Sequence, residues 1–145
     1  MTTETTKLQE NKRLARSIPE RVFAEGDPDL LDELYAENAI EHNPFGDIHG
    51  RAAIRESYEG FMAAFPDIEQ NVEDIVAEGD TVAMRLTARG THEGPMMGLE
   101  PTGREIEVQQ TVFTHIEDGE IVERWLHPDN LGMLQQLGVV ESEFL

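Results

Sequence analysis

The sequence predicts an α+β fold, in which helices pack against one face of a cone-like, curved antiparallel sheet. Three observations lead to this prediction. Apolar residues recur at helical spacing from residue 8 to residue 65, whereas the two-residue period typical of strands begins near residue 67. Glycine-containing turns at residues 78–80 and 117–119 divide the second half of the chain into two hairpins. Helices followed by antiparallel strands imply a sheet wrapped around the N-terminal helices.

The first half of the chain contains three predicted helices. Residues 8–25 form the first helix, and Pro19 is the point at which this helix kinks or splits. Asp27 is a suitable N-cap for the second helix, and Pro28 suits its first position because a proline lacks the N–H that would be unpaired there. The third helix covers residues 51–65, where the apolar positions share one face and a proline follows.

Strands make up most of the second half. A short strand lies within residues 39–50 and is interrupted by Asn43-Pro44. Two hairpins occupy residues 67–94 and 103–128, and a loop of Gly, Pro and Met separates them. A sheet that curls around a helix encloses a cone, and a cone that side chains do not fill completely holds a small molecule.

Length and composition limit the class of protein. At 145 residues the chain is expected to be one domain, residues 1–145, with a core at about residues 11–138. The absence of cysteine excludes disulfides, thiolate catalysis and Cys-based zinc sites, and His42 and His49 have no standard metal-ligand spacing, so we expect no metal. No apolar run reaches the roughly 18 residues of a membrane-spanning helix, and the N-terminus has no apolar signal region. We therefore expect a cytoplasmic protein that does not contact a membrane.

The chain is strongly acidic. Thirty Asp plus Glu residues face 11 Lys plus Arg residues, which gives a formal net charge of −19. Such a charge repels phosphate backbones, so nucleic acid is not an expected partner. Lysines are scarce, and a lysine-poor acidic surface is typical of proteins from salt-loving organisms, whose surface charges repel one another unless salt screens them. The alternative is an ordinary acidic cytosolic protein.

Three segments carry a resemblance to a known family: "DLLDELYAENAIEHNP", "FMAAFPDIEQNVEDIVAEGDTVAMRLTARGTHEGPMMGLEPTGREI" and "FTHIEDGEIVERWLHPDNLGMLQQLG". They resemble the SnoaL-like polyketide cyclase family of the nuclear-transport-factor-2-like superfamily, and they follow one another in the family's order. The most specific pieces are Gly90-Thr91-His92, Pro101-Thr102-Gly103 and residues 125–129 at the end of the last strand. The resemblance implies a cystatin-like α+β roll, a fold that needs no cofactor and hosts many functions.

The resemblance also implies an activity. Characterised members of the family close a ring by intramolecular aldol condensation, and Asp129 best matches the aspartate expected to act as acid and base. The ligand would be a small apolar carbonyl compound, and the enzyme a cyclase-like lyase or isomerase. Such an enzyme holds its substrate folded, moves one proton and excludes water. Isomerisation or hydration of a carbonyl or epoxide is a second enzymatic interpretation, although the Asp-Arg-Asp set expected of epoxide-opening relatives is missing from the sequence.

Asp129 also has a purely structural interpretation. Aspartate and asparagine are favoured helix N-caps, and Asp129-Asn130 stands directly before a predicted final helix at residues 131–137. If Asn130 is the cap, Asp129 is freer to face inward. Residues 123, 125, 127 and 129 share one strand face, which makes Trp125 and His127 substrate-binding candidates. Their alternatives are core filling for Trp125 and a solvated strand end for His127.

The partner strand supplies two further candidates, Gln109 and Thr111. If residues 117–119 form a three-residue loop with a bulge, Thr111 lies opposite Trp125 and Gln109 lies opposite His127. A two-residue turn shifts the register by one residue and places Gln110 opposite His127. We predict the first register, and therefore Gln109 and Thr111 as substrate-binding residues.

Four more side chains are predicted to line the pocket: His42, Phe61, Phe65 and Met97. His42 ends the short strand where family members often have a histidine facing the cavity, and its alternative is a hydrogen bond to loop backbone. Phe61 and Phe65 would cover the cavity from the third helix, or else pack that helix on the sheet. Met97 would give the pocket mouth an adaptable contact, or else cover a sheet edge.

The open face of the sheet predicts a homodimer. Residues of the opposite strand parity are apolar enough to be buried between two copies; they are Val108, Val112, Val122 and Leu126. A non-catalytic ligand-binding or dimerisation module is the rival function. In that case the site residues would provide only packing and a helix cap.

Overall fold

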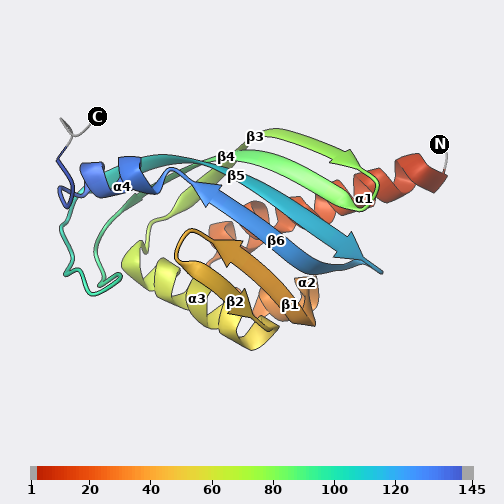
Figure 1. The fold of residues 1–145 in the computed structure, drawn as a ribbon, viewed down its shortest axis with the longest axis horizontal. Coiled ribbons are helices and arrows are strands. Elements are labelled where there is room, and N and C mark those ends of the chain that lie inside the picture. The colour runs from red at the N-terminus through yellow and green to blue at the C-terminus, as the bar shows by residue number, and fades with distance from the viewer. Residues whose placement is uncertain (1–2, 142–145) are drawn as a thin grey trace.

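The computed structural model describes residues 3–141, and its elements follow the predicted order (Figure 1). The helical elements are α1 (Thr3–Ser17), η1 (Ile18–Phe23), η2 (Pro28–Leu30), α2 (Leu31–Leu34), α3 (Arg51–Ala64) and α4 (Asn130–Gln136). The strands are β1 (Tyr35–Asn43), β2 (Gly46–His49), β3 (Glu69–Glu78), β4 (Thr81–Thr91), β5 (Glu105–Glu117) and β6 (Glu120–Pro128). The expected α+β class is confirmed.

The strands form one curved sheet in the order β2-β1-β6-β5-β4-β3. Neighbouring strands run antiparallel except β1 and β6, which pair in parallel. The sheet is therefore antiparallel as expected, apart from this one parallel pair. Helices α1 and α3 lie on the same side of the sheet, and β6 lies beside β1, with which it pairs (Figure 1). This arrangement places the first strand of the chain beside the last one.

Two local predictions about the N-terminal helices can be compared with the structure. From Ile18 the backbone widens into the π-helical segment η1, with Pro19 in its first turn. Proline lacks an N–H and its ring crowds the carbonyl one turn earlier, so the predicted kink takes the form of a wider helical turn. The predicted Asp27 cap is confirmed, because its side chain accepts a hydrogen bond from the backbone N–H of Asp29 at 3.0 Å.

The hairpin between β5 and β6 has a register that neither sequence alternative predicted. Glu117 pairs with Glu120 across a two-residue turn of Asp118-Gly119, both with positive φ, as a type I′ turn requires. A bulge between residues 115 and 116 then shifts the register by one more residue. As a result Thr111 lies opposite His127, Phe113 opposite Trp125, and Gln110 opposite Pro128. The predicted pairing of Gln109 with His127 was wrong for this reason.

The face of β5 that points inward also differs from the prediction. Along β5 the even-numbered residues 106–116 face inward and all but one are buried, whereas the odd-numbered residues 105–113 are exposed. Val108 and Val112, which we expected on an open dimer face, are therefore core residues. Leu126 lines the interior in the same way, and Val122 is half-buried. The apolar residues of these strands lie on the face that packs against the helices, so the predicted dimer face was wrong.

Candidate active site

A pocket of about 780 Å³ lies between the inner face of the sheet, α3, the tip of the β1–β2 hairpin and the loop after β4. Its wall is mainly apolar; the largest apolar contributors include Phe23, Phe45, Phe61, Ile106, Leu126 and Met133. The exposed side chains of Phe45 and Met97 stand at the rim. A pocket of this size and character is typical of sites for small organic ligands.

One part of this wall is polar and buried. Glu41, Tyr58 and Arg124 line the pocket, although no more than 6% of any of them is exposed. Nη1 of Arg124 donates to Oε1 of Glu41 at 3.1 Å and to the hydroxyl of Tyr35 at 2.8 Å, and it also contacts the Tyr58 hydroxyl. The two tyrosine hydroxyls lie 3.0 Å apart and both reach Oε1 of Glu41. A buried ion pair therefore lies in a mainly apolar wall.

Strand pairing brings the two charges together. Glu41 and Arg124 are register partners in the parallel pair of β1 and β6, so their side chains leave neighbouring strands at the same level and on the same face. Tyr58 reaches them from α3, where it is buried together with Ile54. Without an ionic partner, either buried charge would carry a large desolvation penalty.

Burial also sets the protonation of this cluster. It raises the pKa of Tyr35 and of Tyr58 well above the usual value, because a phenolate is poorly solvated in the interior. Both hydroxyls therefore remain protonated donors. Burial opposes the charge of Arg124 more than any other factor, but its surrounding acceptors raise the pKa of the guanidinium overall. The cluster thus presents a permanent cation beside neutral hydroxyls.

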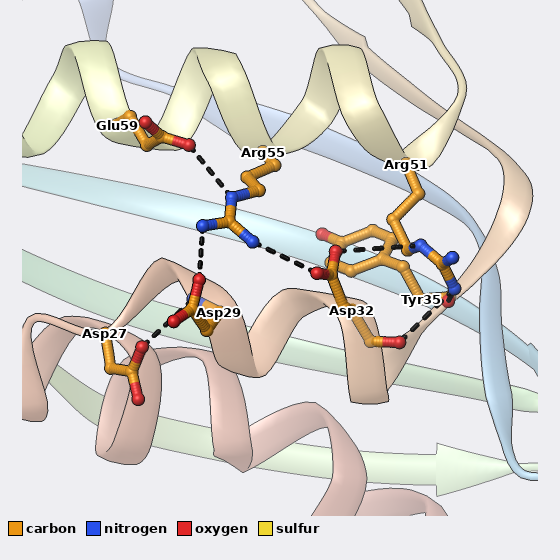
Figure 2. A network of polar contacts seen from close by, with 7 residues as sticks. All are labelled: Asp27, Asp29, Asp32, Tyr35, Arg51, Arg55 and Glu59. Carbon is orange, nitrogen blue, oxygen red and sulfur yellow. Dashed lines mark hydrogen bonds and ion pairs between the residues drawn. The ribbon is translucent and has the colours of Figure 1, made fainter.

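Ionic contacts at the surface hold α3 in position over the cluster (Figure 2). Arg55 contacts Asp29, and it reaches Asp32 at 3.0 Å and Glu59 at 2.9 Å. One turn earlier, Arg51 donates to the carbonyl oxygen of Tyr35 at 3.2 Å. These contacts tie α3 to the segment that leads into β1, which is the element that carries Glu41.

The structure places Asp129 outside the pocket. Its side chain accepts a hydrogen bond from the backbone N–H of Gly132 at 2.9 Å, and the residue is exposed. This is the N-cap geometry of α4, so the expectation that the carboxylate faces inward was wrong. The physical reason is that β6 ends at Pro128, and the next residue already belongs to the helix start. A catalytic role for Asp129 stays a prediction, without a place in the wall to support it.

The other strand candidates share the outer face of the sheet. Gln109, Thr111 and His127 are exposed, Trp125 is half-buried, and none of them lines the pocket. The inward positions at this level are held instead by other residues, namely Gln110, Arg124, Leu126 and Pro128. Of the two neighbouring glutamines, Gln110 lines the pocket and Gln109 does not.

Three further residues were predicted to line the pocket: Phe61, Phe65 and Met97. Two of them do so, and the third is buried in the core. Phe61 lines the pocket and packs edge-on against Phe23, and Met97 forms part of the rim. Phe65 is fully buried outside the pocket, where it packs at 5.5 Å from the His92 ring. Helix-to-sheet packing, the structural alternative, thus describes Phe65, while Phe61 remains a predicted ligand contact.

His42 faces away from the pocket, on the opposite side of β1 from Glu41. Its Nδ1 pairs with Asp47 at 2.7 Å, its Nε2 pairs with Glu123 at 2.6 Å, and its ring stacks on Trp125. Neither the expected cavity position nor a backbone hydrogen bond is found. Instead the imidazole joins β1, β2 and β6 on the outer surface.

This bridge predicts a pH-dependent contribution to stability. Hydrogen bonds, first to Glu123 and then to Asp47, raise the pKa of His42 above its usual value of 6.5. Because the folded state holds the proton more tightly, the contribution is complete below about pH 6.5 and is lost as pH rises through the higher folded-state pKa. Melting temperatures from about pH 5.5 to about pH 8.5 should fall more for the native protein than for His42→Gln. Parallel curves would contradict this assignment.

Residues 13–137 match the family described as SnoaL-like polyketide cyclase. This chain belongs to that family. Among residues 3–141, no helix is long and apolar enough to cross a membrane, and no group of three His, Cys, Asp or Glu side chains is arranged to hold a metal ion.

Several known proteins resemble this SnoaL-like chain. The aklanonic acid methyl ester cyclase DauD of Streptomyces sp. (strain C5) is 33% identical over 111 residues, which are 75% of this chain and 67% of DauD. The nogalonic acid methyl ester cyclase of Streptomyces nogalater is 30% identical over 113 residues, covering 77% and 78% of the two chains. The structure of IdmH of Streptomyces antibioticus, for which a polyketide cyclase function has been suggested, superposes with a TM-score of 0.75 at 36% identity, covering 89% of this chain and 99% of IdmH.

Sequence reasoning missed the buried cluster of this SnoaL-like domain, although one signal for it exists. Arg124 stands between the apolar positions Val122 and Leu126 of the same strand face. A charged residue at a core position of a strand is rarely buried without a partner. Glu41, two residues after Ala39 on β1, is the matching charge. A search for ionisable residues at the strand positions that share a face with apolar residues would have selected both Arg124 and Glu41.

Proposed function

We propose that this protein binds an apolar carbonyl compound in the pocket and catalyses an acid/base rearrangement, either an aldol-type ring closure or an isomerisation. One observation carries the proposal: an apolar pocket of about 780 Å³ has a buried Glu41–Arg124 pair and Tyr58 in its wall. An apolar enclosure excludes water and strengthens the interaction of a bound carbonyl with such groups. The names of the two curated relatives refer to methyl esters of aklanonic and nogalonic acid, and we extend that class, a ring system bearing an ester or ketone, to this chain.

Filling the pocket should weaken ligand binding. Ala88 lines the pocket from β4, so Ala88→Phe would occupy the space of a ligand ring. We expect the Kd of a neutral polycyclic ester, such as methyl anthraquinone-2-carboxylate, to rise about tenfold or more, equal to about 1.4 kcal/mol. Isothermal titration calorimetry measures this change. Thr111→Phe on the exposed outer face is the matched control, and equal affinities of all three proteins would contradict a ligand site in this pocket.

A non-catalytic ligand-binding module is the second candidate function. The position of Asp129 as a helix cap favours it, since the acid implied by the family resemblance is absent from the wall. In that case the ester would bind in the pocket, but no carbonyl compound would be converted.

We also propose a homodimer, formed through the outer face of the sheet rather than through the predicted residues. Phe113 is 45% exposed and lies opposite the half-buried Trp125, so this face carries apolar surface that a second copy could cover. Because the net charge is −19, association should strengthen as salt screens the repulsion between copies. Sedimentation velocity at high salt should give a dimer for the native chain and a monomer for Phe113→Glu. A native monomer at every salt concentration would exclude the dimer.

A further inference from the structure

The buried cluster leaves one acceptor and one donor without a partner inside the protein. Every hydrogen bond that Glu41 accepts from residues 3–141 reaches Oε1, so its second carboxylate oxygen, Oε2, remains available. Nε of Arg124 is buried and has no hydrogen-bond partner within the described part of the chain. Both residues line the pocket, and both are at least 98% buried. Buried polar atoms are normally paired, so an unpaired donor in a pocket wall points to a ligand atom that completes it.

We propose that Glu41 is the proton-transfer group of this pocket and that Nε of Arg124 binds the carbonyl oxygen of the substrate. This inference rests on the proposed function and specifies its substrate class: a compound with an acidic C–H between two carbonyl groups. Because the two side chains leave register-paired positions of adjacent strands, a single β-dicarbonyl unit can meet both.

The reaction consumes and releases no net proton, and it needs no co-reactant. Oε2 of Glu41 takes the proton as the C–H bond breaks, and the electron pair becomes an enolate whose oxygen lies on Arg124. The enolate carbon then attacks a third carbonyl of the same molecule, which is not one of the two that flank it, forming a C–C bond and an alkoxide. Glu41 returns its proton to the alkoxide. The product is an isomer of the substrate, and both side chains end in their starting states.

The rest of the cluster orients these two groups. Tyr35 and Tyr58 hold Oε1 of Glu41 at 3.2 and 3.0 Å, which fixes the carboxylate and leaves its other oxygen outside these contacts. Their raised pKa values keep both hydroxyls as donors during the reaction. The cation of Arg124 is permanent, so it stabilises the enolate at the moment when charge develops there.

Hydrogen exchange of a simple probe tests this division of roles. The probe is 1-(2-naphthyl)butane-1,3-dione, a neutral β-diketone, whose exchange at the central carbon in D2O is followed by NMR while calorimetry gives its Kd. We expect the native protein to accelerate exchange. Glu41→Gln should lower that acceleration by about 10²- to 10⁴-fold with little change in Kd. Asp129→Asn, which conserves a cap residue, should leave both unchanged.

Each outcome separates the inference from the proposed function. Binding without accelerated exchange would overturn the role of Glu41 and leave the pocket as a ligand site. Loss of exchange in Asp129→Asn, with exchange retained in Glu41→Gln, would overturn it in favour of Asp129. Absence of binding would overturn the proposed ligand class, and the inference with it.

Conservative variants keep the test informative if Glu41→Gln folds poorly. Glu41→Asp keeps the ion pair but withdraws the carboxylate by one carbon, so we expect slower exchange with unchanged Kd. Arg124→Lys keeps the charge but lacks Nε, and it should reduce exchange by about 10²- to 10³-fold. It should also weaken the long-wavelength absorbance of the bound enolate. Full exchange in both variants would contradict the proposal.

Discussion

Glu41→Gln is expected to lower the free energy of unfolding by about 3–5 kcal/mol, because it leaves a buried guanidinium without its anion. Arg124 is 2% exposed, and within residues 3–141 its only ion pair is with Glu41. The amide keeps the shape of the carboxylate but cannot offset the charge. Equilibrium unfolding in urea measures the loss directly, with the midpoint as the readout.

The control for this prediction is the same substitution in a surface pair. Glu107 lies 2.6 Å from Arg89, but their side chains are 62% and 48% exposed. Water and salt screen such a pair, so Glu107→Gln should cost less than about 1 kcal/mol. A Glu41→Gln variant as stable as Glu107→Gln would mean that Arg124 is solvated or otherwise compensated, and the cluster described here would be incorrect.

Gly94→Ala is expected to destabilise the fold by about 3 kcal/mol, the upper end of the usual cost of overpacking. Gly94 follows β4, and its N–H donates to the carbonyl of Ala64 at 3.1 Å at the end of α3. A Cβ at this position would lie well under 3.0 Å from the carbonyl oxygen of Ala63, which is backbone and cannot rotate away. The melting temperature should fall by roughly 6–12 °C.

Gly60→Ala is the matched control, because the same methyl group should have the opposite effect there. Gly60 lies within α3, and a Cβ would meet no heavy atom within 4 Å. Alanine is the better helix former by about 0.5–1 kcal/mol, so this variant should melt a few degrees higher. If Gly94→Ala proved as stable as the native chain, the close contact between the loop and α3 would not exist.

Local chemistry accounts for the elements that could be predicted. The Asp27 cap, the α3 boundaries near Pro66 and the Asp118-Gly119 turn depend on side chains within a few residues of the structure they form. The change of period near residue 67 separated the helices from the later strands, whereas β1 and β2 lie within the segment of helical spacing, where only one short strand was predicted. The wider turn at Pro19 also has its cause in one residue.

Strand parity at the site could not be predicted with the same success. The outer residues Trp125 and His127 were chosen because they bear chemistry, although the apolar parity, which includes Val112 and Leu126, is the one that faces a core. The bulge between residues 115 and 116 moved the pairing once more. Since side chains alternate with a period of two, one inserted residue reverses every assignment beyond it.

Short-range pattern was thus sufficient for the α+β class and the order of the elements. Long-range pairing was needed for the site, because Glu41 and Arg124 are separated by 83 positions and meet only where β1 runs beside β6. A parallel pairing of the first and last strands leaves no mark in either segment alone. Which charges become neighbours therefore depends on the folding of the whole sheet around its helices.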